Sequence, residues 1–329
     1  MARITITDVA RVAGVSKPTV SRVLNNHADV SAETRRRVME AIEALGYIPS
    51  SKARSLSTGR HGTVGLLMRL NGWWGFTDVQ YGIADEVERR GWHLLVHPLQ
   101  PGAEAERDFV ARILPGLPID GLILLMPEGM LAEISASGMP VAVIDDRGQR
   151  PGLPYVESTN REGARTAVQH LIEHGRKRIA FVTGQQGDAF AKQRYEGYLD
   201  ALREAGLPAD PSLVLRSDAF ELHPSDISTL LPAEPDAIFA GWDEIAYATL
   251  NTLHAAGRKV PDDVAVIGYD DSPIARVMFP PLTSVRQPFR RMGRAAVRML
   301  LDSLDHGAPV ANASVPTSLV VRSSCGPHA

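Results

Sequence analysis

The chain has 329 residues, 44% of them hydrophobic and 22% charged, which is typical of a folded protein with about two or three domains and excludes a disordered chain. No apolar run reaches about 18 residues, and the first residues lack the apolar core of a secretory signal, so we expect neither a membrane span nor export. The one cysteine, Cys325, allows no internal disulfide and fits the reducing cytoplasm.

Charge is unevenly distributed along the chain. Residues 1–60 carry ten basic against five acidic side chains, although the whole chain has a net charge of −3. A small basic segment on a larger acidic body indicates contact with a polyanion such as a nucleic acid. An ordinary fluctuation of surface charge would give the same imbalance, so the segment has to be judged from its residues.

Three short helices are predicted in the basic segment. Thr7 can cap the first helix, and Gly14 can end it in a left-handed conformation. Ser16 can cap the second helix, whose outer side carries polar and basic residues. The third helix can begin after Ser31 and end before Gly46. Two short helices joined by a tight turn with glycine form a helix-turn-helix, whose second helix fits the major groove of DNA.

The segment 10–25, ARVAGVSKPTVSRVLN, resembles the head of the lactose-repressor (LacI) family of bacterial transcription regulators. The similarity continues through residues 30–49, VSAETRRRVMEAIEALGYIP, and the alternative is a three-helix packing module. The resemblance implies contacts with double-stranded DNA. In the head, the residues expected to make them are Thr5, Thr7, Ser16, Lys17, Pro18, Thr19, Ser21, Arg22, Asn25, Ser31, Thr34 and Tyr47.

Residues 49–61 are the predicted hinge, which in the family forms a short helix that enters the minor groove as a symmetric pair. Ala53 and Leu56 lie three residues apart, on one face of such a helix. The segment is too short to be helical alone in water, so we expect it to order only on DNA and against its twin. Ser50, Ala53 and Leu56 complete the predicted DNA contacts, with Leu56 as an apolar wedge between base pairs. The alternative is a flexible polar tether.

Residues 62–329 alternate apolar runs with amphipathic helical stretches, which predicts an α/β domain with parallel sheets covered on both faces. This part resembles the two-lobed, periplasmic-binding-protein-like effector domain of the same family. The resemblance implies three crossings between the lobes, near 158, 286 and 314. The predicted domains are a head at 1–48, a hinge at 49–61 and an effector-binding and dimerisation domain at 62–329, with lobe 1 at 62–158 and 287–314 and lobe 2 at 159–286 and 315–329.

Ligands of such domains bind at the carboxyl ends of the strands, so we expect the effector site there. Trp73, Trp74 and Phe76 follow the first predicted strand, and aromatic rings stack on sugars and other flat ligands. The alternative for each of them is a place in the core of the lobe.

Asp145, Arg194 and Asp270 align with effector contacts of the family, and Gln287 lies at the last crossing between the lobes. The alternative for each of these four residues is a salt bridge at the surface or between the lobes. Phe220 follows another predicted strand and can add an aromatic face. Trp242 and Thr159 stand where the family commonly has a polar amide and a carboxylate, so we expect a less charged and more aromatic cleft. The predicted effector contacts are Trp73, Trp74, Phe76, Asp145, Arg194, Phe220, Trp242, Asp270 and Gln287.

Motifs of catalysis are missing from the sequence. It contains no phosphate-binding loop, no nucleophile elbow and no paired metal-ligand spacing, so we expect no enzyme, no cofactor and no metal. We predict a homodimeric repressor that binds a palindromic operator. A small glycoside or oligosaccharide is expected to release it from this DNA. A nucleoside or another planar molecule acting as co-repressor is the alternative effector. A solute-binding protein is the distant alternative, and the basic head argues against it.

Overall fold

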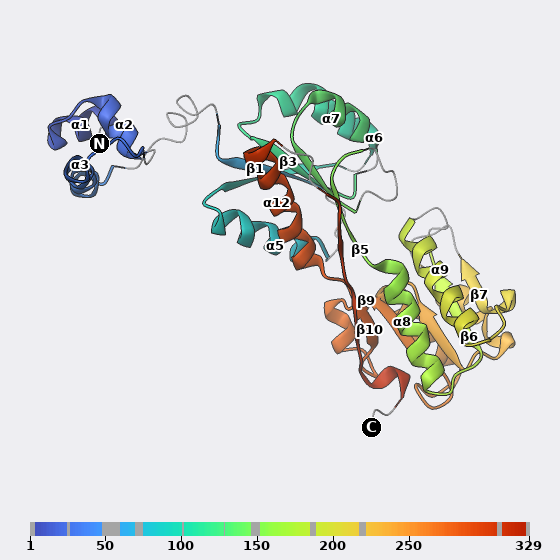
Figure 1. Ribbon diagram of the computed structural model, residues 1–329. Coiled ribbons are helices and arrows are strands. Elements are labelled where there is room, and N and C mark those ends of the chain that lie inside the picture. The colour runs from blue at the N-terminus through green and yellow to red at the C-terminus, as the bar shows by residue number, and fades with distance from the viewer. Residues whose placement is uncertain are drawn as a thin grey trace. The chain divides into compact units, whose positions relative to one another are not determined.

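The computed structural model describes residues 4–24, 27–47, 60–69, 75–100, 102–127, 129–145, 152–184, 189–216, 222–307 and 311–326. The chain divides into two compact units, Met1–Gly62 and Thr63–Ala329 (Figure 1). None of the described helices is both long and apolar enough to cross a membrane.

Three helices build the first unit: α1 (Ile6–Ala13), α2 (Lys17–Leu24) and α3 (Ala32–Leu45). Their apolar faces meet in one core, which contains Val9, Ala10, Ala13, Val20, Val23, Val38, Ala41 and Tyr47. Each helix is short for an isolated helix in water, so burial against the other two is what stabilises it. The predicted three-helix head is confirmed.

Most of the predicted helix caps are present. Ser16 and Ser31 accept hydrogen bonds from the backbone N–H groups three residues further on, at 3.3 Å and 3.2 Å. Gly14 and Gly46 follow α1 and α3 in the left-handed conformation, with φ of 64° and 57°. These are the conformations in which glycine costs least, because it has no side chain to clash with the preceding turn.

The prediction that Thr7 caps the first helix is wrong, because α1 begins earlier, at Ile6, and Thr5 is its cap. The Asp8 carboxylate accepts hydrogen bonds from the backbone N–H of Thr5 at 3.0 Å and from the Thr5 hydroxyl at 2.7 Å. These bonds stabilise the ionised form, and the side-chain bond from Thr5 contributes most to lowering the pKa of Asp8. Asp8 therefore acts three residues after the cap, as in a capping box.

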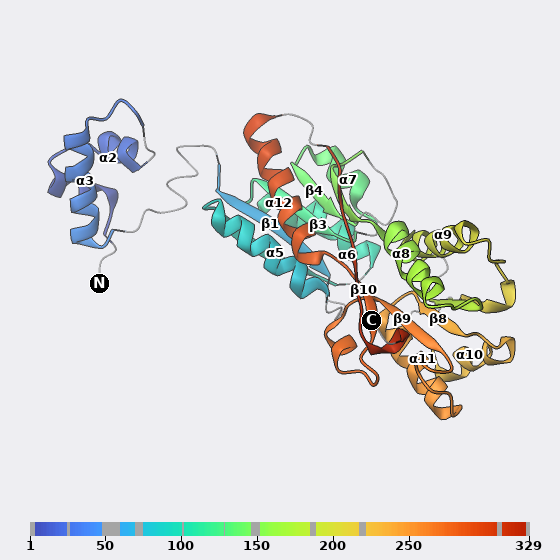
Figure 2. The same ribbon diagram turned by 60° about the horizontal axis from the view of Figure 1, so that its bottom comes forward.

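Two six-stranded sheets form the second unit, one in each lobe (Figures 1 and 2). The order in lobe 1 is β11 (Ala313–Val315), β5 (Tyr155–Ser158), β4 (Val141–Ile144), β3 (Gly121–Leu125), β1 (Thr63–Arg69) and β2 (His93–Leu99). The order in lobe 2 is β12 (Ser318–Val320), β10 (Thr283–Arg286), β9 (Ala265–Asp270), β8 (Ala237–Ala240), β6 (Ile179–Thr183) and β7 (Val214–Arg216). All neighbours are parallel except β10 and β12. The predicted α/β class is confirmed.

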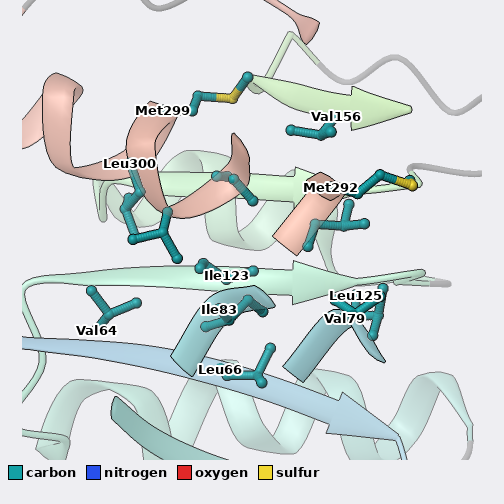
Figure 3. Close-up of a cluster of buried hydrophobic side chains, with 14 of the residues drawn as sticks. Val64, Leu66, Val79, Ile83, Ile123, Leu125, Val156, Met292, Met299 and Leu300 are labelled. Atoms are coloured by element: carbon teal, nitrogen blue, oxygen red, sulfur yellow. The ribbon is translucent and has the colours of Figure 1, made fainter. Parts of the chain in front are cut away.

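Helices cover both faces of each sheet. In lobe 1, α5 (Gly75–Arg89) and α12 (Phe289–His306) pack on one face, and α6 (Ala103–Asp108) and α7 (Leu131–Ser137) lie on the other. In lobe 2, α8 (Asn160–Glu173) and α9 (Ala189–Glu204) pack on one face, and α11 (Asp243–Ala255), with α10 (Pro224–Ser228) beside it, lies on the other. Figure 3 shows the first of these cores, where Val79 and Ile83 of α5 and Met292 of α12 lie against Ile123 and Leu125 of β3.

Helices α5 and α12 cross at very close range. A side-chain carbon on Gly82 would lie 2.1 Å from the backbone oxygen of Arg290, and one on Gly293 would lie 2.4 Å from that of Val79. Both distances are too short for real atoms, so the two glycines are what allows the helix backbones to touch. This contact joins α12, which is late in the chain, to the first helix of lobe 1.

The chain passes between the lobes three times: from β5 to α8, from β10 to α12 and from β11 to β12. Val315, which we expected in lobe 2, lies in β11 of the lobe 1 sheet, so the third crossing comes slightly later, at residues 316–317. Hydrogen bonds join the first and third crossings. The Thr317 N–H donates to the Thr159 hydroxyl at 3.0 Å, and the Thr159 N–H donates to the Val315 carbonyl at 3.2 Å.

Candidate functional site

The outer side of α2 presents the residues that the sequence pattern assigned to DNA. The exposed ones are Ser16, Lys17, Pro18 and Arg22, and the half-buried ones are Thr19 and Ser21. The Arg22 guanidinium pairs with Asp29 at 3.1 Å, and both side chains are more than half exposed. A surface pair of this kind contributes at most about 1 kcal/mol, so Arg22 can exchange Asp29 for a phosphate.

Part of the positive charge of the head has a structural task. A guanidinium nitrogen of Arg35 donates to the His27 carbonyl at 2.8 Å, and Arg37 donates to the Ala13 carbonyl. These bonds tie α3 to the turn after α2 and to the end of α1. The sequence shows three consecutive arginines, but it does not show which of them form these structural bonds, because the acceptors lie elsewhere along the chain. The basic surplus therefore overstates the charge available to a polyanion.

The other head candidates lie at helix ends. Thr5 and Thr7 are exposed at the start of α1, and the Ser31 hydroxyl donates to the Thr34 hydroxyl at 2.9 Å at the start of α3. Tyr47 differs from expectation: it is only 8% exposed and packs in the core of the head, because the chain turns back onto the helices after α3. The remaining candidates and the predicted hinge helix lie outside the described residues; they are Asn25, Ser50, Ala53 and Leu56.

A buried ion pair forms the centre of the candidate effector site in lobe 2. Arg194 belongs to α9 and Asp270 is the last residue of β9, and each side chain is 2% exposed. A guanidinium nitrogen of Arg194 (Nη2) lies 3.2 Å from Oδ1 of Asp270. The other two nitrogens donate to Oδ1 of Asn160 at 3.0 Å and to the Gly241 carbonyl. Arg194 is thus held in place by three different segments.

Two aromatic rings flank the same guanidinium. The Arg194 Cζ atom lies 3.8 Å from the centroid of the Tyr269 ring and 5.1 Å from that of Trp242. Trp242 lies between β8 and α11, directly before the first residue of α11, and Tyr269 lies in β9. A guanidinium stacks well on aromatic faces, so both rings stabilise its charge in the interior. The structure thereby brings together three predicted contacts, Arg194, Asp270 and Trp242.

Amide groups connect this pair to two of the lobe crossings. Asn160, at the first crossing, accepts from Arg194, and Gln287, at the second, donates to the same Asn160 oxygen at 3.4 Å. The Gln287 side chain is buried, and its oxygen has no hydrogen-bond partner among the described residues. A buried acceptor without a partner costs free energy that a hydroxyl donor would recover. Sequence reasoning missed Asn160 as a site residue, although it adjoins the unusual Thr159.

Burial controls the protonation of the acids in lobe 2. Desolvation raises the pKa of Asp270 well above its usual range, and the attraction of Arg194 offsets only part of this. Asp243, at the start of α11, is fully buried, and desolvation raises its pKa to about 7. Bonds from the Ser284 hydroxyl and the Ser272 N–H, both at 2.6 Å, act in the opposite direction but are outweighed. A negative Asp243 in turn disfavours a negative Asp270.

Lobe 1 supplies fewer of the predicted contacts. Asp145 directly follows β4, is 6% exposed and has a left-handed backbone with φ of 53°. Phe76 was expected in the cleft but belongs to the core between α5 and the sheet, because it lies on the inner face of that helix and is buried. The other predicted aromatic contacts lie outside the described residues; they are Trp73, Trp74 and Phe220.

Comparison with known proteins identifies the class of protein that this fold and these sites define. Residues 5–50 match the family described as bacterial regulatory proteins of the lacI family, and residues 168–325 match a periplasmic binding protein-like domain. The chain is 38% identical to the HTH-type transcriptional regulator CelR of Thermobifida fusca, over 98% of both chains. It therefore belongs to the LacI family of DNA-binding transcription regulators.

Two solved structures of this family resemble the chain over nearly its whole length. A complex of the transcriptional regulator CelR with cellobiose has a TM-score of 0.72 and 33% sequence identity, covering 98% of this chain and 100% of that one. The lac repressor dimer bound to operator and the anti-inducer ONPF has a TM-score of 0.82 and 27% identity, covering 99% of this chain and 100% of that one. Both support the two-lobed arrangement described above.

Proposed function

We propose that this regulator is a repressor that binds its operator as a homodimer and is released by a small neutral carbohydrate, with a glycoside or oligosaccharide favoured. The observation that carries the effector class is the buried pair of Arg194 and Asp270, with the rings of Trp242 and Tyr269 beside Arg194. The similarity to a regulator solved with cellobiose supports the same class.

The chemistry of the pair favours an uncharged, hydroxylated ligand. Arg194 already donates to Asp270, Asn160 and the Gly241 carbonyl, so an anion would have to displace these acceptors. The oxygens of Asp270 and Gln287 are acceptors that suit hydroxyl donors, and the remaining N–H groups of Arg194 suit hydroxyl oxygens. Trp242 adds an aromatic face. We infer that Asp145 of lobe 1 and the aromatic residues Trp73, Trp74 and Phe220 complete the site.

Exposed apolar side chains support the homodimer. Val277 is 81% exposed and Phe279 is 95% exposed, and Tyr247 and Ile274 of the same lobe are also exposed. Val277 and Phe279 lie two residues apart in the chain, and neighbouring large apolar groups exposed to this extent often mark protein contacts. The lac repressor, which resembles this chain, was solved as a dimer on its operator. We propose that these residues lie between two copies of the chain.

Binding, and not catalysis, is the proposed activity, and the cytoplasm is the proposed location. Within the described residues, no group of three or more His, Cys, Asp or Glu side chains is arranged to hold a metal ion. The buried acids of lobe 2 are instead engaged by arginine, serine and backbone groups. We propose that they act through ligand affinity alone.

The DNA half of the proposal is tested by selecting binding sites from random-sequence DNA. We expect an imperfect palindrome with half-sites about one helical turn apart. The logarithm of the affinity should fall with the logarithm of salt concentration by about 0.9 per phosphate contacted. Arg22→Ala should weaken binding and flatten this slope, whereas Arg36→Ala, on the outside of α3 and paired with Glu33 and Glu40, should not. A salt-independent affinity would contradict the proposal.

The effector half is tested by thermal shift against a panel of cellobiose, other disaccharides, monosaccharides and nucleosides. Stabilisation by sugars and not by nucleosides is the expected result. Stabilisation by a nucleoside that also tightens operator binding would establish the alternative, a planar co-repressor.

A further inference from the structure

A second buried acid, Asp271, directly follows the Asp270 of the effector site. Its side chain is 1% exposed and lies between two arginines. Arg286 donates to one carboxylate oxygen at 2.7 Å, and Arg322 donates to the other at 2.5 Å. Two charge-assisted bonds to one buried carboxylate form a strong and directional contact. We call this group, Asp271 with Arg286 and Arg322, the two-arginine clamp.

The two arginines lie at opposite ends of the antiparallel pair formed by β10 and β12. Arg286 is the last residue of β10, directly before the second crossing. Arg322 follows β12, the strand that begins after the third crossing. Its guanidinium also donates to the Leu282 carbonyl at 2.5 Å, and its backbone N–H donates to the Thr283 hydroxyl at 2.8 Å. The clamp therefore fastens the end of β9 to the residue that precedes the second crossing and to the far end of β12, the strand that follows the third crossing.

The backbone at the two aspartates is held in conformations that side chains other than glycine rarely adopt. Asp270 has φ of 105° and Asp271 has φ of 55°. Such residues persist when their surroundings determine them, and they cluster where structure serves function. Here the surroundings are Arg194 on the side of Asp270, and the clamp together with the Ser284 hydroxyl, which accepts from the Asp271 N–H at 3.0 Å. One peptide unit thus joins the effector pair to the clamp.

The first crossing is connected to the same network from the other side. Asn160 accepts from Arg194 of the effector pair and from Gln287 of the second crossing. Thr159 and Thr317 join the first crossing to the third. A ligand that moves Arg194 or Asp270 therefore acts on groups bonded to all three crossings.

We propose that Asp271 is a positioning residue that couples the Arg194–Asp270 site to the connections between the lobes. The inference rests on the proposed function, since it takes this site to be the effector site. A ligand that displaces Asp270 changes the strained peptide, the clamp then shifts the ends of β10 and β12, and the angle between the lobes follows. Residues in such a contiguous network change coupling between sites by about three- to thirtyfold when substituted.

The test begins without any ligand. Asp271→Asn removes the charge but keeps the shape and the tolerance for left-handed backbone. Hydrogen exchange followed by mass spectrometry on the full-length protein should show faster exchange in peptides covering residues 283–290 and 313–322. Glu86→Gln is the matched control, because Glu86 is a buried acid held by Arg89 and Arg298 away from the crossings. Unchanged exchange at the crossings in Asp271→Asn would overturn the proposal.

The second readout is the ratio of operator affinities without and with cellobiose. Asp271→Asn should reduce this ratio by about three- to thirtyfold while leaving sugar-free operator binding in place. Arg286→Gln, at a residue that is 48% exposed and so tolerates substitution, should have the same effect, and combining the two should add little. A lower melting temperature with an unchanged ratio would show a purely structural role and refute the coupling.

The two proposals fail in different ways. If cellobiose does not change operator binding by the wild-type protein, the proposed effector is wrong, and the exchange comparison with Glu86→Gln alone decides on the clamp. If the wild-type protein responds and Asp271→Asn responds equally, the effector stands and the clamp falls. If Asp271→Asn does not fold, Arg286→Gln provides both readouts.

Discussion

Removing Arg194 alone should destabilise lobe 2 strongly. Its side chain is 2% exposed, bonds to three groups and stacks on Tyr269, so Arg194→Ala removes the positive partner of Asp270 and one donor each from Asn160 and the Gly241 carbonyl. Breaking a buried ion pair by removing one partner costs about 3–5 kcal/mol. For a unit of this size, that loss lowers the melting temperature by about 10 °C.

The size of the effect distinguishes a buried pair from a surface pair. Arg203→Ala is the matched control, because Arg203 is 72% exposed and its pair with Asp200 should contribute at most about 1 kcal/mol. Removing both charges, with Arg194→Met and Asp270→Asn together, should recover much of the loss, since no uncompensated charge then remains buried. Asparagine suits position 270 because it tolerates a positive φ.

Urea unfolding followed by tryptophan fluorescence provides the measurement, with Trp242 lying 5.1 Å from the Arg194 guanidinium. We expect Arg194→Ala to lower the unfolding free energy by several kcal/mol, Arg203→Ala to leave it nearly unchanged, and the double variant to fall between them. Equal stability of Arg194→Ala and wild type, or a double variant as unstable as the sum of the single losses, would refute the description of this pair.

Three further predictions concern packing, pH and assembly. Gly82→Ala should cost about 1–3 kcal/mol, because its side chain would lie 2.1 Å from a backbone oxygen of α12, whereas Gly116→Ala, which meets no atom within 4 Å, should be tolerated in thermal melts. Asp243 has a folded pKa of about 7 against 3.8 in the unfolded chain, so the folded state binds its proton more tightly and stability falls as pH rises between these values. Between pH 5 and 7 the fall is worth about 2–3 kcal/mol, and urea midpoints of Asp243→Asn should lack this part of the slope. Phe279→Ser should shift the protein toward monomer in sedimentation, and an unchanged dimer would place the interface elsewhere.

The sequence predicted the elements well where local chemistry determines them. The caps Ser16 and Ser31 and the terminating Gly14 and Gly46 follow from rules that act within a few residues, and the parallel strands follow from apolar runs. The cap predicted at Thr7 is two residues too late, because the bonds from Thr5 to Asp8 start the helix earlier.

Tertiary contacts were harder to predict. The resemblance placed Arg194 and Asp270 at one site, but their mutual bond depends on how α9 approaches the end of β9. Phe76 was assigned to the cleft as one of three neighbouring aromatic residues, and Tyr47 was assigned to DNA from the resemblance, but the structure buries both. The outcome depends on which side of the helix or turn faces the core. A single aromatic residue gives no periodicity from which that side can be predicted.

The central claim, that a carbohydrate in lobe 2 controls DNA binding, is tested most directly by linkage. Operator affinity is measured by fluorescence anisotropy with and without saturating cellobiose, and cellobiose affinity is measured by calorimetry with and without operator. We predict that operator and cellobiose each weaken the affinity of the protein for the other by the same factor, about 5- to 150-fold. The Asp270→Asn variant should keep its operator affinity and lose this response. Operator affinity that stays constant across a sugar concentration shown by calorimetry to saturate the protein would contradict the account.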